Sequence, residues 1–179
     1  MKICGISGSL RTGSYNTALL HAVREIAAPD HDVVIAEIGD IPLYNGDVEQ
    51  AEGIPASVER VAGMIREADA LLIVTPEYNA GIPGVLKNAM DWISRVKPSV
   101  YDAKPTAMMG TSPGNLGTAR AQMQLRNQLA NLNCRTVAQP MIYVGHAGKY
   151  FDEGKDGLDD TTRGFVEKQL AALAALVKA

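Results

Sequence analysis

Residues 2–27 read KICGISGSLRTGSYNTALLHAVREIA, and the pattern changes twice along this stretch. Lys2 to Ile6 is short and apolar, which is typical of a buried strand. Residues 7–14 are rich in glycine and serine and predict a loop. From Thr17 the pattern becomes helical, with Asn16 expected as the N-cap. A strand, a loop and a helix are therefore expected in this order, the helix marked by Leu19, Val23, Ile26 and Ala27.

The same order of strand and helix recurs along the chain. Pro83 is acceptable in the first turn of the third helix, and Pro140 interrupts the fifth strand. This alternation predicts one α/β domain over residues 1–179, with a parallel sheet covered by helices on both faces. The further strands are expected at 32–38, 68–74, 106–110 and 135–144, and the further helices at 58–65, 85–93, 125–132 and 165–177.

Composition narrows the function classes. The formal net charge is −3, so no basic field would attract nucleic acid. No apolar run approaches the length of a membrane span, and the amino terminus lacks a signal-peptide pattern. Cys4 and Cys134 are far apart in the sequence and form no metal or disulfide framework, which suits a reducing compartment. We therefore expect a cytoplasmic protein without nucleic-acid or membrane partners.

The loop between the first strand and helix, Gly8 to Thr17, has the chemistry of a phosphate site. A helix N-terminus offers free amides and partial positive charge. Hydroxyls of Ser9 and Ser14 and the forked donors of Arg11 add to these amides. An ordinary capped loop is the alternative interpretation, but the combination and its position favour phosphate.

Three other motifs fit this region less well. A triphosphate-binding loop needs Gly-Lys-Ser/Thr where the chain has Gly13-Ser14-Tyr15, and a dinucleotide-binding loop needs glycines at positions held by Ser7 and Leu10. The run from Gly5 to Ser9 resembles a hydrolase nucleophile elbow, with His146 as a conceivable base, but its final glycine is missing. A hydrolase stays a distant option.

Two more loops follow buried strands at the same edge of the predicted sheet. Thr75 to Gly84 combines prolines, which restrict the backbone, with glycines, which permit close approach to a flat ring. Thr111 to Gly117 is small and polar. Ligands of parallel sheets lie beyond the carboxyl ends of strands. A mononucleotide flavin explains all three loops together better than three unrelated turns.

The chain resembles the NADPH-dependent FMN reductase family, including its bacterial quinone, azo-dye and chromate reductase members. The resemblance rests on three motifs, which are Gly8-Ser9-Leu10-Arg11-Thr12-Gly13-Ser14-Tyr15-Asn16, the run PEYNAGIPGVLKNAMDW at 76–92, and Gly117-Thr118-Ala119-Arg120-Ala121-Gln122. It implies a flavodoxin-like three-layer sandwich with a five-stranded parallel sheet in the order 2-1-3-4-5.

The resemblance also implies the contacts of the cofactor. The flavin atom N5 would carry the hydride chemistry, so no catalytic acid or base is assigned. The phosphate would be surrounded by Ser9, Arg11, Ser14, Tyr15, Asn16 and Thr17. The isoalloxazine ring would adjoin Pro76, Glu77, Tyr78, Asn79 and Gly81, with Ser112 and Gly114 in the third loop.

In the implied cycle, NADPH or NADH reduces FMN and a small acceptor then takes the electrons from the same side. The acceptor classes are quinones, azo compounds, free flavin and chromate. A homodimer or homotetramer is implied, with helix 85–93 as the candidate interface, although Met90 and Trp92 could equally be core residues. A single-electron carrier that docks on proteins is the rival function. The acidic stretch 152–160 is expected as an exposed loop, and no metal is assigned to it.

Overall fold

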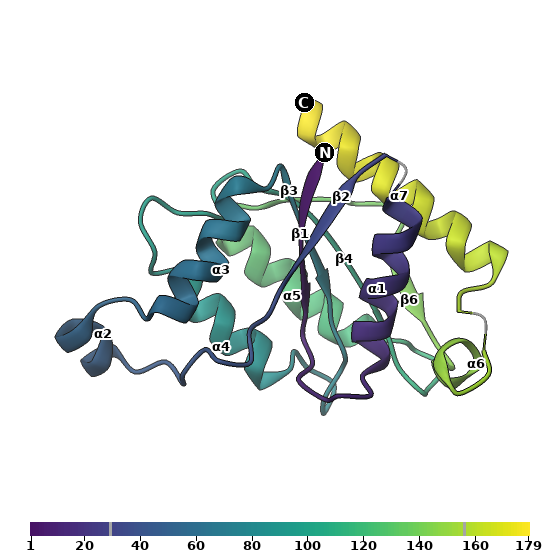
Figure 1. The fold of residues 1–179 in the computed structure, drawn as a ribbon, viewed down its shortest axis with the longest axis horizontal. Coiled ribbons are helices and arrows are strands. Elements are labelled where there is room, and N and C mark those ends of the chain that lie inside the picture. The colour runs from purple at the N-terminus through teal and green to yellow at the C-terminus, as the bar shows by residue number, and fades with distance from the viewer. Residues whose placement is uncertain (29, 156) are drawn as a thin grey trace.

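All strands of the computed structural model, which describes residues 1–28, 30–155 and 157–179, join one parallel sheet (Figure 1). The strands in these ranges are β1 (Lys2–Ser7), β2 (Asp32–Ala36), β3 (Ala70–Val74), β4 (Pro105–Thr111), β5 (Arg135–Thr136) and β6 (Ile142–Val144). The helices are α1 (Tyr15–Ala27), α2 (Gly46–Glu52), α3 (Ala56–Glu67), α4 (Gly84–Ile93), α5 (Ala119–Asn131), α6 (Gly148–Phe151) and α7 (Asp160–Lys178).

The strand order is β2-β1-β3-β4-β5, which confirms the predicted flavodoxin-like order. The fifth predicted strand, however, is present in two pieces. Both β5 and β6 pair with β4, in register at Thr106↔Thr136 and Met109↔Ile142. Pro140 lies between the pieces and has no N–H to donate to a ladder, which accounts for the break.

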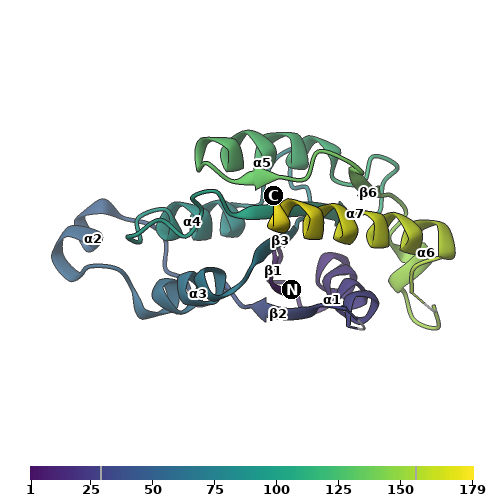
Figure 2. The ribbon, with the colours of Figure 1, turned by 90° about the horizontal axis from the view of Figure 1, so that it is seen from above.

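The helices cover the sheet in two groups that confirm the three-layer prediction. Helices α3, α4 and α5 lie on one face, and α1 and α7 lie on the other (Figures 1 and 2). The first face buries Ile65 and Trp92 against Ile73, and the second buries Leu20 and Leu170 with its own strand residues. The apolar residues that recur along these helices therefore form two separate cores, one on each face of the sheet.

Helix α1 begins two residues earlier than predicted, at Tyr15. Its N-cap is Ser14, whose Oγ accepts from the amide of Thr17 at 3.3 Å, so the prediction that Asn16 is the N-cap was wrong. Asn16 lies inside the first turn, and its side chain donates to the Thr111 carbonyl and accepts from the Thr111 amide, each at 2.9 Å. The side chain of Asn16 therefore bonds to the backbone of Thr111, far along the chain, and does not cap its own helix.

Two short helices were not predicted. Helix α2 has no buried residue, and α6 is four residues long, so neither has a periodic apolar face to detect. At α4, Pro83 lies just before the first helical residue, Gly84. Met90 and Trp92 are 3% and 0% exposed and belong to the core of this chain. In the described ranges, the helices are all too short or too polar to cross a bilayer.

Candidate functional site

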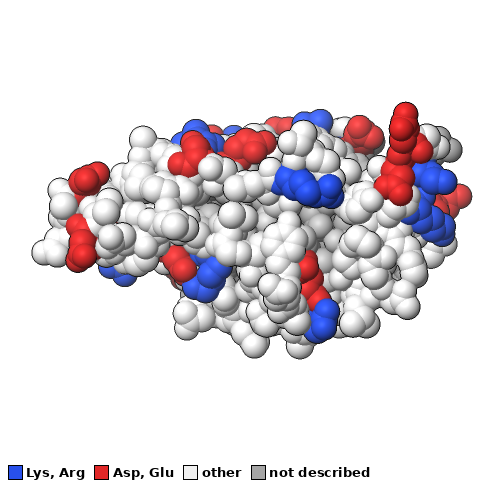
Figure 3. All heavy atoms as spheres, turned by 90° about the horizontal axis from the view of Figure 1, so that it is seen from below, with Lys and Arg blue, Asp and Glu red and all other residues white. Residues whose placement is uncertain are grey.

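A cavity of about 220 Å³ opens at the carboxyl ends of the strands, where the chain passes from β1 into α1, from β3 towards α4, and from β4 towards α5. These connections, loop one (8–14), loop two (75–83) and loop three (112–118), meet at the lower edge of the molecule in Figure 1. Figure 3 looks onto this edge and shows a mostly uncharged surface with scattered charged side chains. The cavity is lined by Ser9, Arg11, Ser14, Tyr15, Asn16, Pro76, Glu77, Tyr78, Thr111, Ser112 and Pro113.

Loop one supplies donors to this cavity. The first-turn amides of Tyr15 and Asn16 have no acceptor within α1, because a helix cannot satisfy its first N–H groups internally. Arg11 is exposed, and its guanidinium carbon lies 5.5 Å from the centre of the Tyr15 ring. The hydroxyl groups of Ser9 and Tyr78 are 3.4 Å apart and connect loop one to loop two. This arrangement suits an anion.

The acidic stretch begins beside loop one. Tyr15 Oη donates to Asp152 Oδ1 at 2.7 Å, and this bond raises the pKa of Tyr15. At the far end, Asp159 caps α7 by accepting from the Thr162 amide at 2.8 Å. Asp156, within the same stretch, lies outside the described residues. No group of three or more His, Cys, Asp or Glu side chains in the described ranges could hold a metal ion.

Loop two forms a tight hairpin turn. Tyr78 and Gly81 exchange backbone hydrogen bonds of 3.1 and 3.0 Å, with Asn79 and Ala80 at φ values of 49° and 61° between them. Positive φ at both central residues is the geometry of the hairpin turn that usually has Asn-Gly, so Ala80 occupies a strained position. Tyr78 is 50% exposed at the rim. The turn holds its peptide groups in a fixed orientation.

Glu77 points away from the turn to helix α5. Its carboxylate accepts from the amides of Arg120 and Ala121 at 2.9 and 3.1 Å and from Arg120 Nε at 2.6 Å. Burial of Glu77, whose side chain is 5% exposed, raises its pKa, but the Arg120 guanidinium and the two amides outweigh burial and the pKa is lowered. Glu77 is thus a carboxylate with its acceptor positions filled by the protein.

Loop three is supported from behind by the chain after β6. The Ser112 amide donates to Val144, and the Ala147 amide donates to Ser112, at 3.1 and 3.0 Å. A Cβ at Gly145 would lie 2.8 Å from the Asn115 carbonyl oxygen, so only glycine permits this approach. At the inner wall, the buried Thr111 hydroxyl has no hydrogen-bond partner among the described residues. A buried polar atom of this kind suits a site for a polar ligand.

The structure brings most of the predicted flavin contacts together. Those that line the cavity are Ser9, Arg11, Ser14, Tyr15, Asn16, Pro76, Glu77, Tyr78 and Ser112. Thr17, Asn79, Gly81 and Gly114 lie in the same elements but outside the lining. The hydroxyl of Thr17 is 2.8 Å from that of Ser7, so one of the two hydroxyls donates to the other.

Two lining residues, Thr111 and Pro113, were not singled out from the sequence. Their position in the third loop was the available signal, since every residue at a strand's carboxyl end is a candidate. The partnership of Glu77 with Arg120 had no sequence signal, because 43 residues separate them. The two thiols are free, and burial raises the pKa of Cys4 to about 12 and that of Cys134 to about 11. Neither is a reactive thiolate.

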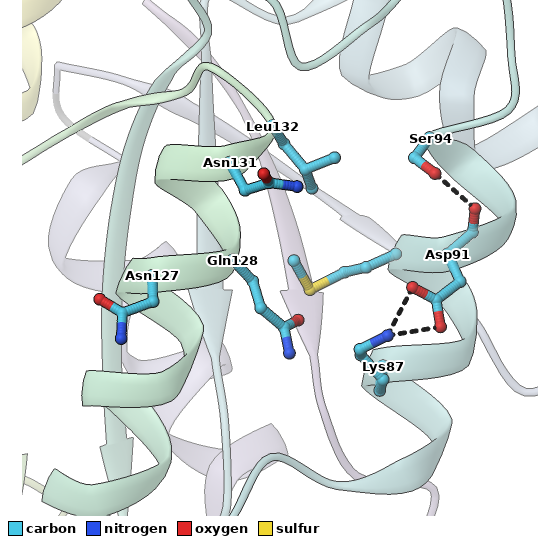
Figure 4. Close-up of a pocket in the computed structure, with 8 residues that line it drawn as sticks. Lys87, Asp91, Ser94, Asn127, Gln128, Asn131 and Leu132 are labelled. Atoms are coloured by element: carbon cyan, nitrogen blue, oxygen red, sulfur yellow. Dashed lines mark hydrogen bonds and ion pairs between the residues drawn. The ribbon is translucent and has the colours of Figure 1, made fainter.

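A second cavity, of about 290 Å³, lies between α4 and α5 (Figure 4). Lys87 points to Asp91 in this view, and the two form an ion pair with Nζ–O distances of 2.6 and 2.7 Å. The opposite wall is lined by Asn127, Gln128 and Asn131 of α5. The charged groups are already paired and no loop of the sheet edge reaches this cavity, so the first cavity is the better functional candidate.

Comparison with known proteins agrees with this choice. The sequence profile described as NADPH-dependent FMN reductase matches residues 1–149. The chain is 46% identical to an NAD(P)H-dependent FMN reductase of Pseudomonas aeruginosa, over 99% of this chain and 96% of that protein. It is 40% identical to a 2-hydroxy-1,4-benzoquinone reductase of a Burkholderia species, over 99% and 97% of the two chains.

A solved structure is also similar to this chain over nearly its whole length. FerB, a flavoenzyme NAD(P)H:(acceptor) oxidoreductase from Paracoccus denitrificans, superposes with a TM-score of 0.87 and 35% sequence identity. The alignment covers 99% of this chain and 97% of FerB. The likeness therefore extends over the sheet, both helical layers and all three loops.

Proposed function

The chain belongs to the NADPH-dependent FMN reductase family, and from this premise we propose that it is an FMN-dependent oxidoreductase. FMN binds in the cavity at the carboxyl edge of the sheet, NADPH or NADH supplies electrons, and a small acceptor such as a quinone receives them. The observation that supports this proposal most directly is that three loops, far apart in the sequence, surround one cavity at the edge where parallel sheets bind nucleotides.

Loop one holds the phosphate in this proposal. The amides of Tyr15 and Asn16 and the hydroxyls of Ser9 and Ser14 offer hydrogen bonds, and Arg11 offers charge. Thr17 supports the loop from below through its contact with Ser7. Because Arg11 is exposed and pairs with no carboxylate among the described residues, it is available to a dianionic phosphate.

Loops two and three hold the ring. The peptide groups from Pro76 to Gly81 are fixed by the hairpin turn at Asn79, and Tyr78 adds an aromatic surface at the rim. Ser112 and Gly114 approach from loop three. Small residues and fixed peptide groups allow close contact with a planar heterocycle.

The residues present fit such a cofactor. The cavity joins an anion-binding end to a wall of main-chain groups, and the hydroxyl of Thr111, one of the lining residues, lacks a protein partner among the described residues. FMN, when bound, supplies the redox chemistry by accepting electrons from the nicotinamide and passing them to the acceptor. The chain's own contribution is to bind, orient and shield, and we assign it no acid or base.

A homodimer or homotetramer is the assembly we propose. Several large apolar side chains are exposed on loops. Leu10 and Leu116, in loops one and three, are 51% and 59% exposed, and Leu43, between β2 and α2, is 86% exposed. Exposed apolar surface of this kind supports a protein–protein contact. Because Met90 and Trp92 pack inside the chain, only the outward face of α4, with Lys87 and Asp91, is available to a partner. The two free thiols support a reducing compartment, such as the cytoplasm.

Anaerobic stopped-flow absorbance tests the proposed reaction. The FMN-loaded protein is mixed separately with NADH and NADPH, and benzoquinone is then added. We expect rapid loss of the oxidised flavin absorbance, followed by its return with the quinone. Bound FMN that neither nucleotide bleaches would contradict the proposal and would favour the electron carrier.

A further inference from the structure

Glu77 stands out in the cavity wall because its side chain has no capacity left for a ligand. Oε2 accepts from the amides of Arg120 and Ala121, Oε1 accepts from Nε and Nη2 of Arg120, and the side chain is 5% exposed. A group whose acceptor positions are filled does not need the cofactor to satisfy it. Glu77 must therefore affect the site indirectly, through the protein groups that its carboxylate binds.

Glu77 holds the start of helix α5. Thr118, at the N-cap position, makes no side-chain capping bond, and the amides of Arg120 and Ala121 in the first turn are satisfied by Glu77 instead. Negative charge is favourable at a helix N-terminus because of the helix dipole. Loop two thus caps a helix that begins more than 40 residues later in the chain.

The other end of the hairpin turn is attached to the same helix. Gln124 Nε2 donates to the Ala80 carbonyl at 3.2 Å, and its Oε1 accepts from the Ile82 amide at 3.4 Å. Arg120 and Gln124 are four residues apart, so they lie on one face of α5. The turn formed by Tyr78, Asn79, Ala80 and Gly81 is held at both ends by one rigid element.

This double attachment fixes a strained turn. Ala80 has a positive φ, which is unfavourable for a residue with a side chain, and such a conformation persists where its surroundings enforce it. Without Glu77, the turn would keep its own pair of backbone bonds and its contacts with Gln124 but lose the attachment of its first end to α5. The peptide groups from 76 to 81, which face the ring in the proposed function, would then move relative to loop one.

We propose that Glu77 is a positioning residue for the flavin ring: its carboxylate, with Gln124 as a second attachment, locks the ring-binding turn onto helix α5 and touches no part of the cofactor. This inference rests on the proposed function. It assigns Glu77 a different role from direct cofactor contact, and it separates the ring end of the site from the phosphate end, where Arg11 acts.

The test compares flavin binding by the wild-type chain and by Glu77→Ala, Glu77→Gln, Gln124→Ala and Arg11→Ala. FMN and riboflavin, which lacks the phosphate, are titrated by flavin fluorescence. We expect Glu77→Ala to raise the Kd of both ligands about 10-fold, because several charge-assisted bonds are lost. Gln124→Ala should raise both about 3-fold. Arg11→Ala should raise the Kd of FMN and leave that of riboflavin unchanged.

Matched variants and a second readout separate positioning from general stability. Gln128 lies one turn after Gln124 on α5, and Glu59 is exposed on α3. The control variants Gln128→Ala and Glu59→Gln should both leave flavin binding unchanged. The visible circular dichroism of bound FMN should change in Glu77→Ala and Glu77→Gln, because it reports the surroundings of the ring. Glu77→Gln retains one acceptor oxygen and provides a folded variant, with a Kd about 3-fold raised.

Failure of the positioning role and failure of the proposed function give different results. Wild-type Kd values and an unchanged flavin spectrum in both Glu77 variants, with or without a lowered Tm, would overturn the positioning role and leave the proposed function intact. A wild-type chain that binds neither FMN nor riboflavin would overturn the proposed function itself, and this inference with it.

Discussion

Glycine at position 110 illustrates how one residue can determine the spacing of two elements. A Cβ built there would overlap the Thr75 carbonyl oxygen and the Thr118 hydroxyl. Gly63 in α3 is the opposite case, since a Cβ there would meet nothing within 4 Å. Glycine is required at the first position and costs helix stability at the second.

The two positions give a matched prediction. Gly110→Ala should lower the free energy of unfolding by about 2 kcal/mol or more, because β4 must move away from loop two. Gly63→Ala should raise it by about 0.4–1 kcal/mol, because the unfolded chain loses freedom. Urea unfolding followed by circular dichroism measures both. Equal stabilities of the two variants would contradict the close contact at Gly110.

Residue identities at the site were predicted better than their partners. The three loops followed from strand ends and glycine-rich segments, which are local signals, and most of the lining residues were assigned by the family resemblance. Asn16 was assigned to a cap because nothing local indicates a bond to Thr111, 95 residues away. The same holds for Glu77 and Arg120. Long-range pairing depends on the assembled sheet, and a single sequence does not encode it as a pattern.

At the scale of elements, a side chain of helix α7 satisfies backbone groups at the break in the fifth strand. Pro140 stops the ladder between β5 and β6, and this leaves carbonyl groups of β4 and of the break itself without strand partners. Gln169 of α7 is 2% exposed and donates Nε2 to the carbonyls of Met108 and Pro140, at 3.2 and 2.7 Å. The proline predicted the interruption, but the helix residue that compensates for it had no sequence signal.

Replacing Gln169 tests this role. Gln169→Leu should lower the free energy of unfolding by about 1–3 kcal/mol, because one buried and one part-buried carbonyl lose their donor. Glu167→Leu on the exposed side of the same helix should change it by less than about 0.5 kcal/mol. Chemical denaturation of the two variants in parallel gives the comparison. A Gln169→Leu chain as stable as wild type would show that the carbonyls are satisfied in another way.

The cap of α7 gives a pH dependence with a defined sign. The Thr162 amide and hydroxyl, followed by Lys149, lower the pKa of Asp159 from 3.8 to about 2. A lowered folded-state pKa means that the cap stabilises the fold above about pH 4 and loses this contribution as the pH falls towards 2. Asn also caps helices but does not titrate.

Wild type and Asp159→Asn should therefore converge in acid. The Tm of wild type should exceed that of the variant at pH 6, and the difference should shrink progressively between pH 4 and pH 2. Thermal unfolding at four or five pH values measures it. A difference that is constant over this range would mean that Asp159 titrates normally in the folded chain.

At the scale of the whole molecule, the layering followed from the alternation of strands and helices, and the strand order followed from the family resemblance. Parallel strands need crossovers, and right-handed crossovers with two helical faces leave few arrangements. The short helices α2 and α6 escaped prediction because α2 has no buried residue and α6, with four residues, is too short to show a helical period. The fold was thus predictable where buried residues recur with the period of a helix or strand, and not at short elements that lack such a repeat.

Cofactor binding should stabilise the entire fold, because the site joins β1, β3, β4, α1 and α5. For a ligand that binds only the folded state, the gain at 100 times its Kd is about 2.7 kcal/mol. For a chain of this size we expect FMN to raise the Tm by about 5–10 °C. Differential scanning fluorimetry of apoprotein against FMN concentration measures this shift, with adenosine monophosphate as a control. A Tm that does not depend on FMN would contradict binding at this edge.

The paired bonds between Asn16 and Thr111 also determine when the site can exist during synthesis. The first turn of α1 emerges early from the ribosome, but its partner at the end of β4 follows 95 residues later. Loop three then needs the amide of Ala147 and the carbonyl of Val144 behind it. A nascent chain that ends before α6 therefore carries a loop one with the right residues and no completed pocket. Cofactor loading must wait until most of the polypeptide has been made.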